Sequence, residues 1–109
     1  MNNKTFLILF SFLFVSFLST FFVYTQHHET IHFDINKNFG CINQTKEVSI
    51  FKGSVTCHEF KNTTEEQNNI RNTLHSQNEL VGYYIILLIS VIYIILFFVL
   101  FCLFLKEDR

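Results

Sequence analysis

The sequence contains no proline, no tryptophan and no alanine, and only 3 glycines. It has no cluster of lysine and arginine and a formal net charge of −1, which excludes the basic surface of a nucleic-acid-binding protein. It also lacks a glycine-rich phosphate loop, a nucleophile motif and a zinc-protease helix, so we expect no enzyme and no cofactor. Phenylalanine, with 15 residues, is in excess. The codon bias of an AT-rich genome, such as that of a DNA virus, explains this excess without a binding role.

Half of the 109 residues are hydrophobic, and they are concentrated in two blocks, Phe6–Tyr24 and Val81–Leu105. A globular core would instead distribute apolar residues at helix or strand spacing. The second block carries no charge, and at ~1.5 Å per residue it exceeds a hydrocarbon core of ~30 Å. Tyr83 and Tyr84 stand where an aromatic belt is expected. The sequence therefore predicts one transmembrane α-helix at residues 81–105, with the lipid bilayer as its partner.

The first block has the pattern of a secretory signal peptide. Lys4 and the free amine form a short positive region, and an apolar run starting at Phe6 follows directly. The best cleavage site ends at Thr25, so we predict that residues 1–25 are a cleavable N-terminal signal peptide. The alternative is that the block is retained as a second span, because its apolar run is close to the ~18 residues that cross a bilayer.

Flanking charges predict the orientation of the chain. Lys106 and Arg109 follow the second block, whereas neither lysine nor arginine occurs in that block or just before it. The positive-inside rule places residues 106–109 in the cytosol, and Lys4 places the N-terminus there before any cleavage. Residues 26–80 are therefore predicted to be lumenal or extracellular, in a membrane of the secretory pathway between the ER and the plasma membrane.

Residues 26–62 are predicted to form a small lumenal module. Apolar and polar residues alternate at 31–35, 48–50 and 55–57, which predicts short strands. The stretch Glu47–Cys57 resembles the early strands of an immunoglobulin-type domain, in which a glycine separates an edge strand from a cysteine-bearing one. The chain has no tryptophan and too little sequence after Cys57 to complete such a sandwich. Two or three strands are therefore the expected extent of this β-rich segment.

Residues 63–80 are predicted to form a polar stalk between the module and the membrane. Thr63 or Thr64 is a candidate N-cap, and acidic residues follow it, as in the first turn of a helix. Asparagine richness opposes a helix here. We expect a partly helical stalk that runs into the membrane span.

The 3 cysteines are predicted to have two different roles. Cys41 and Cys57 lie in the predicted lumenal section, where an oxidising compartment favours a disulfide bond between them; pairing between chains is the alternative. A loop of this size stabilises the fold by about 3 kcal/mol in the chain-entropy account. Cys102 lies near the cytosolic end of the predicted span, as an apolar membrane residue or as a site of lipidation by palmitate.

Asn43 and Asn62 each begin an Asn-x-Thr sequon in the predicted lumenal section, and we expect N-glycosylation of at least one. All 5 histidines lie in the predicted lumenal section, and three of them are within residues 26–32, directly after the predicted cleavage site. Cleavage before Gln26 would make His28 the third residue, where it binds copper or nickel together with a terminal amine. Solvated histidines are the simpler interpretation, so no metal site is predicted.

These features predict a single-pass type I membrane glycoprotein with a small disulfide-stapled lumenal segment. We expect it to act by binding a protein partner, as a receptor-like, decoy or accessory subunit. The alternative is a two-span hairpin protein that retains the first block, oligomerises and alters membrane permeability, like a viroporin. No polar stripe lines either block to indicate a water-filled pore.

Overall fold

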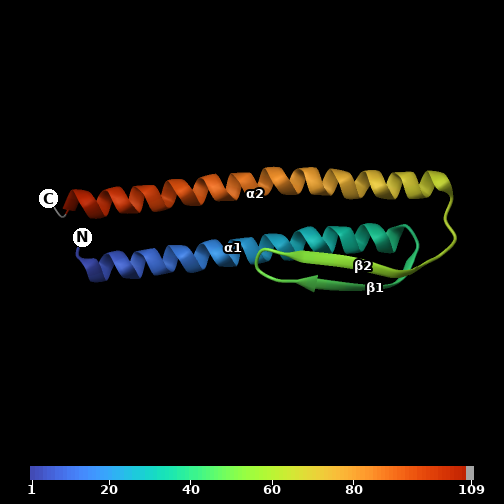
Figure 1. The fold of residues 1–109 in the computed structure, drawn as a ribbon, viewed down its shortest axis with the longest axis horizontal. Helices are drawn as coiled ribbons and strands as arrows, with labels where there is room; N and C mark the ends of the chain where they lie inside the picture. Colours follow the sequence, from blue (N-terminus) through green and yellow to red (C-terminus); the bar gives the residue numbers. More distant parts are fainter. Residues whose placement is uncertain (108–109) are drawn as a thin grey trace.

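A computed structural model describes residues 1–107 as two long antiparallel helices and a small β-hairpin (Figure 1). The molecule is an elongated rod, 69 Å along its longest axis. Met1 and Glu107 lie at the same end of the rod, where the amine of Met1 contacts the carboxylate of Glu107. The elements follow in the order α1 (Asn3–Asn38), β1 (Cys41–Val48), β2 (Gly53–Phe60) and α2 (Glu65–Glu107).

Two long apolar helices are present, whereas the sequence predicted one transmembrane helix after a signal peptide. Both α1 and α2 are long and apolar enough to cross a membrane, and together they indicate association with a membrane. The span predicted at residues 81–105 lies wholly inside α2, and the N-terminal part of α1 contains the segment predicted as a signal peptide. Cleavage after Thr25 stays a prediction. Of the predicted tail, residues 106 and 107 continue α2, and residues 108–109 lie outside the described part of the chain.

Helix α1 continues through residues 31–35, where the alternating pattern predicted a strand, so that prediction is wrong. The segment contains neither proline nor glycine, and nothing in it ends a helix that has already begun. The helix ends at Asn38, where the Phe39 amide bonds back to the carbonyl oxygen of Ile35 at 3.1 Å. Gly40 follows with a φ of 98°, a left-handed conformation that glycine adopts without strain.

Strands β1 and β2 pair antiparallel in a two-stranded sheet. Val48 lies opposite Gly53, and the turn between them is closed by the Ser49 amide, which donates to the Lys52 carbonyl oxygen over 2.7 Å. The predicted strand at 55–57 is confirmed as part of β2. The predicted strand at 48–50 is only partly correct, because β1 ends at Val48 and the next residues form the turn.

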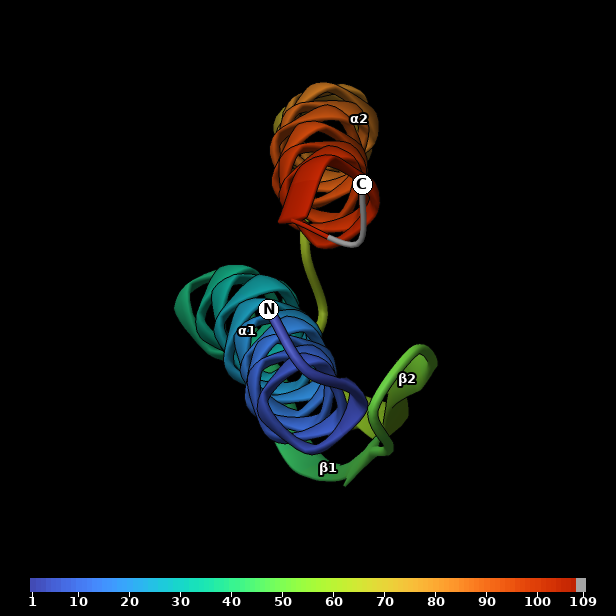
Figure 2. The ribbon, with the colours of Figure 1, turned by 90° about the vertical axis from the view of Figure 1, so that its left-hand side faces the viewer.

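Helix α1 lies between α2 and the β-hairpin (Figure 2). Polar contacts join the hairpin to α1: the Gln44 amide nitrogen donates to the Phe33 carbonyl oxygen over 2.9 Å, and the Thr25 hydroxyl donates to the Ile50 carbonyl oxygen over 3.0 Å. The first contact holds the middle of β1 and the second holds the turn. The hairpin is therefore positioned by the C-terminal half of α1.

The apolar halves of the two helices pack through aromatic side chains. The ring centroids of Phe6 and Phe104 are 4.4 Å apart, and those of Phe17 and Tyr93 are 5.1 Å apart. Phe21 is the only buried hydrophobic side chain among residues 1–107, and many large apolar side chains of both helices are exposed. Such a surface is suited to the hydrocarbon core of a membrane. In water, it would expose a continuous apolar patch, which is unfavourable.

The predicted polar stalk is helical from Glu65 onwards and continuous with the apolar part of α2. The predicted cap is formed by Thr64, whose hydroxyl accepts from the Gln67 amide over 3.1 Å, while the Gln67 side chain accepts from the Thr64 amide over 3.0 Å. This reciprocal capping box satisfies two backbone donors. It offsets the weak helix propensity of the asparagines that follow.

The turn of the β-hairpin reaches the apolar part of α1. The Phe51 ring centroid lies 6.3 Å from that of Phe17 and 5.2 Å from that of Phe21, and the Phe51 side chain is otherwise exposed. Both partners belong to the apolar block of α1, so a membrane around that block also surrounds Phe51. We therefore expect the turn to insert into the outer part of the bilayer.

Tryptophan fluorescence tests this depth, because the chain contains no tryptophan of its own. In Phe51→Trp, we expect strong quenching by lipids brominated on their acyl chains. The matched control is Phe39→Trp, which lies 18 residues from Phe21, about 27 Å along a helix, and should be quenched little. Equal quenching at the two positions would show that the turn does not enter the hydrocarbon.

Candidate functional site

The candidate site is a cluster of four side chains between the two helices, next to the ends of their apolar blocks. His28 and His32 come from α1, and His75 and Glu79 come from α2. Each pair is separated by four residues and therefore lies on one face of its helix. The antiparallel arrangement places the two faces opposite one another. We call these four residues the interhelical histidine cluster.

Glu79 is the shared partner of both α1 histidines. Its Oε1 atom lies 2.6 Å from His32 Nε2 and 3.1 Å from His28 Nε2. His32 also contacts His75, with 2.6 Å between their Nδ1 atoms. The four side chains thus form one connected network across the helix interface.

Two asparagines support the cluster from its edges. The Asn36 side-chain oxygen accepts from His75 Nε2 over 2.9 Å, and the Asn78 side-chain nitrogen donates to the His28 carbonyl oxygen over 3.2 Å. Both asparagine side chains are buried. They orient His75 and fix α2 against the backbone of α1, since a buried amide is costly unless its hydrogen bonds are made.

The environment of the cluster shifts two pKa values. Burial lowers the pKa of His75, and the nearby positive charges of His32 and Arg71 act in the same direction. For Glu79, burial acts to raise the pKa, but hydrogen bonds from His32 and His28 outweigh it, and the pKa is lowered. Glu79 is thus held as a carboxylate against two imidazole rings.

The helices approach closely at this point because Gly82 has no side chain. A Cβ atom at position 82 would lie 2.9 Å from both His28 Cε1 and the Tyr24 hydroxyl oxygen. A small residue at a helix interface allows the backbones to approach, as is common in membrane helix pairs. Gly82 therefore makes room for the His28 ring beside Glu79.

Comparison with known proteins does not identify the chain. No family model, curated protein or solved structure matches it.

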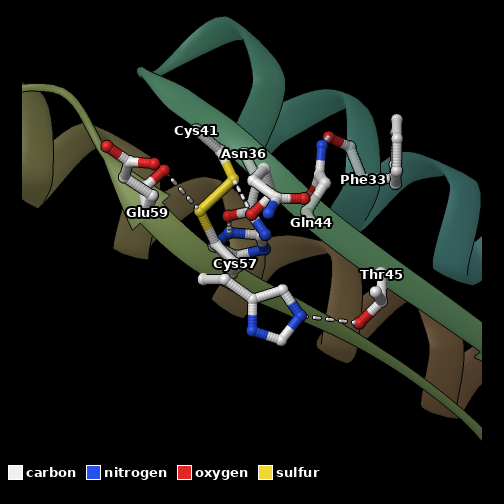
Figure 3. Close-up of a disulfide and its surroundings, with 10 residues drawn as sticks. Phe33, Asn36, Cys41, Gln44, Thr45, Cys57 and Glu59 are labelled. Carbon is white, nitrogen blue, oxygen red and sulfur yellow. Dashed lines mark hydrogen bonds between the residues drawn. A yellow bond between two sulfur atoms is a disulfide. The ribbon is translucent and has the colours of Figure 1, made fainter.

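The predicted disulfide between Cys41 and Cys57 is present, with 6.1 Å between the two Cα atoms (Figure 3). It joins β1 to β2 close to the end of α1, near the buried Asn36. Among the described residues, Cys102 is the free cysteine, and it is exposed on α2. Its exposure leaves the predicted lipidation sterically open.

The other residues singled out from the sequence lie apart from the cluster. The sequon residue Asn43 is exposed in β1, and Asn62 is exposed in the link between β2 and α2. His27 is exposed on α1, and His58 on β2 contacts the Thr45 hydroxyl oxygen at 3.1 Å. Glycosylation at the two asparagines stays a prediction.

Sequence reasoning missed the roles of His75 and Glu79, and it treated His28 and His32 as solvated. The structure instead leaves the side chains of His28 and His32 only 13% and 12% exposed. A spacing signal was present, because the motifs His28-x-x-x-His32 and His75-x-x-x-Glu79 each place two ligand-type side chains on one helix face. Pairing the two motifs required the helix register.

Proposed function

We propose that this protein is a two-span membrane glycoprotein that acts by binding, with α1 retained as an anchor. The lumenal halves of both helices and the β-hairpin form the unit that meets a protein partner, as a receptor-like or accessory subunit. The observation that carries this proposal is the continuity of α1. One helix supplies both an apolar block and the surface on which the hairpin and the interhelical histidine cluster are built.

The predicted cleavage position supports retention. Thr25 lies within α1, its side chain is only 9% exposed, and its hydroxyl bonds to the carbonyl oxygens of Phe21 and Ile50. Cleavage after Thr25 would remove this contact with the hairpin together with the apolar block that packs against α2. Signal peptidase needs an accessible chain with small residues at positions −3 and −1, and the threonine at −1 is tolerable rather than good.

The sheet supports binding. Within residues 1–107, β1 and β2 pair only with each other, so each has an edge that carries no further strand. Such an edge accepts an extended segment of another protein through backbone hydrogen bonds. We therefore expect the partner to contribute an extended segment.

The apolar halves favour binding over membrane permeabilisation. The hydroxyls of Ser16 and Thr20 both contact the Tyr93 hydroxyl, at 2.7 Å and 3.0 Å, between the two helices. These polar groups therefore satisfy one another inside the pair and do not line a water-filled pore.

The intact mass of the mature protein tests retention of α1. We expect the mass of the full chain after enzymatic deglycosylation without reducing agent, because the apolar block of α1 packs as part of the fold. A mass lacking residues 1–25 would establish the type I form with one span and overturn the two-span proposal. Reducing the same deglycosylated sample should raise its mass by two hydrogens, because the disulfide lies within one chain.

A further inference from the structure

We propose that His28, His32 and Glu79 bind one divalent transition-metal ion of the zinc class between α1 and α2. The inference does not depend on the fate of residues 1–25, since all three ligands lie beyond them. Imidazole nitrogens with one carboxylate oxygen are a ligand set suited to zinc, whereas calcium and magnesium prefer oxygen ligands. The site requires no free thiol, so an intact disulfide between Cys41 and Cys57 is compatible with it.

The spacing of the ligand atoms fits a small tetrahedral centre. One ligand atom from each of the three residues lies within 4.8 Å of the other two. Bonds of about 2.0–2.1 Å in a tetrahedral zinc site place ligand atoms roughly 3.4 Å apart. Glu79 Oε1 lies 3.1 Å from His28 Nε2 and 2.6 Å from His32 Nε2. Withdrawal of the half-exposed Glu79 side chain by less than an ångström brings both of its contacts to this spacing.

Hydrogen bonds behind His32 determine which of its nitrogens carries a proton. The Asn36 oxygen accepts from His75 Nε2, so Nδ1 is the unprotonated nitrogen of a neutral His75 ring. His75 Nδ1 therefore accepts from His32 Nδ1. A neutral His32 then presents the lone pair of Nε2 directly to the Glu79 carboxylate. A positive ion must therefore lie between these two atoms: a proton, as in the hydrogen bond from His32 to Glu79, or a metal ion in its place.

A divalent metal ion can replace the protons that lie between Glu79 and the two histidine rings. His28 Nε2 and His32 Nε2 both face the same carboxylate oxygen of Glu79. A proton joins Glu79 to a single ring, whereas a divalent ion accepts lone pairs from both rings and the carboxylate at once. His75 and Asn36 act as positioning residues, because their hydrogen bonds hold His32 in the ligating tautomer.

Titration of the full chain in detergent micelles tests the proposal, with the protein purified through a tag that contains no histidine and then stripped of metal. We expect one Co²⁺ per chain with the intense visible absorption of tetrahedral coordination, and its displacement by one equivalent of Zn²⁺. His32→Ala and Glu79→Gln should each weaken Zn²⁺ binding on the order of 100-fold. His75→Phe, which removes the positioning hydrogen bonds to His32 and Asn36 but no ligand, should weaken it about 10-fold.

His27→Ala is the matched control, because His27 lies on the same helix but is exposed and outside the cluster. It should bind Zn²⁺ as the unaltered chain does. Equal weakening in His27→Ala and His32→Ala, or binding of Co²⁺ only with weak octahedral absorption, would overturn the proposal. X-ray absorption of the Zn²⁺-loaded unaltered chain gives a test independent of variant folding: two imidazoles in the first coordination sphere are expected, and a sphere of oxygen ligands alone would overturn it.

Discussion

Replacing both Cys41 and Cys57 with serine is expected to abolish delivery of the protein to the cell surface. The described chain has almost no buried apolar core, so the disulfide between β1 and β2 is the strongest constraint on the hairpin. Its loss removes about 3 kcal/mol in the chain-entropy account, which is large against the stability of a unit this small. Surface labelling of intact cells, compared with total protein, measures the effect.

Cys102→Ser is the matched control, because this cysteine is free and exposed on α2, outside the β-hairpin. It should leave delivery unchanged. Normal delivery of the double variant would show that the bond does not hold the fold. A disulfide-linked dimer of the unaltered chain on a non-reducing gel would indicate pairing between chains instead.

Placing a side chain at Gly53 is expected to lift the β-hairpin from α1. A Cβ atom at this position would lie 2.5 Å from Glu29 Cγ, and the Glu29 side chain is buried with only 7% exposure. Overpacking of this kind costs about 1–3 kcal/mol. In Gly53→Ala we therefore expect the strand amides to exchange with solvent roughly 5- to 150-fold faster, as measured by hydrogen-exchange mass spectrometry.

The reason for this effect is testable by rescue. Shortening the opposing side chain in Glu29→Ala removes the clash, so the double variant Gly53→Ala with Glu29→Ala should lose less protection than the two single changes predict together. Additive losses would mean that the close approach of Glu29 and Gly53 does not limit the packing of the hairpin.

Features that depend on local chemistry could be predicted from the sequence. An uncharged apolar run such as Val81–Leu105 needs no partner to be recognised, because its length and hydropathy match a bilayer. The disulfide followed from two cysteines in one short section. The cap at Thr64 followed from its hydroxyl and the polar residues after it.

Features that depend on neighbours could not be predicted. The alternation of Ile31, Phe33 and Ile35 fits a strand in isolation, but α1 enters this segment as a formed helix and no residue stops it. The structure also has two long apolar helices where the sequence predicted one transmembrane helix after a signal peptide. The aromatic contacts of the first apolar block with α2, such as that of Phe6 with Phe104, are visible only in the folded chain.

By itself, the sequence determined the two apolar blocks, the polar section between them and the disulfide, since these follow from composition and from the separation of two cysteines. Only the tertiary structure decided that His75 and Glu79 meet His28 and His32. Their approach depends on the antiparallel register of α1 and α2 and on the missing side chain at Gly82, which brings the helices close enough for imidazole and carboxylate to converge. Periodicity along one helix carries no information about the register of another.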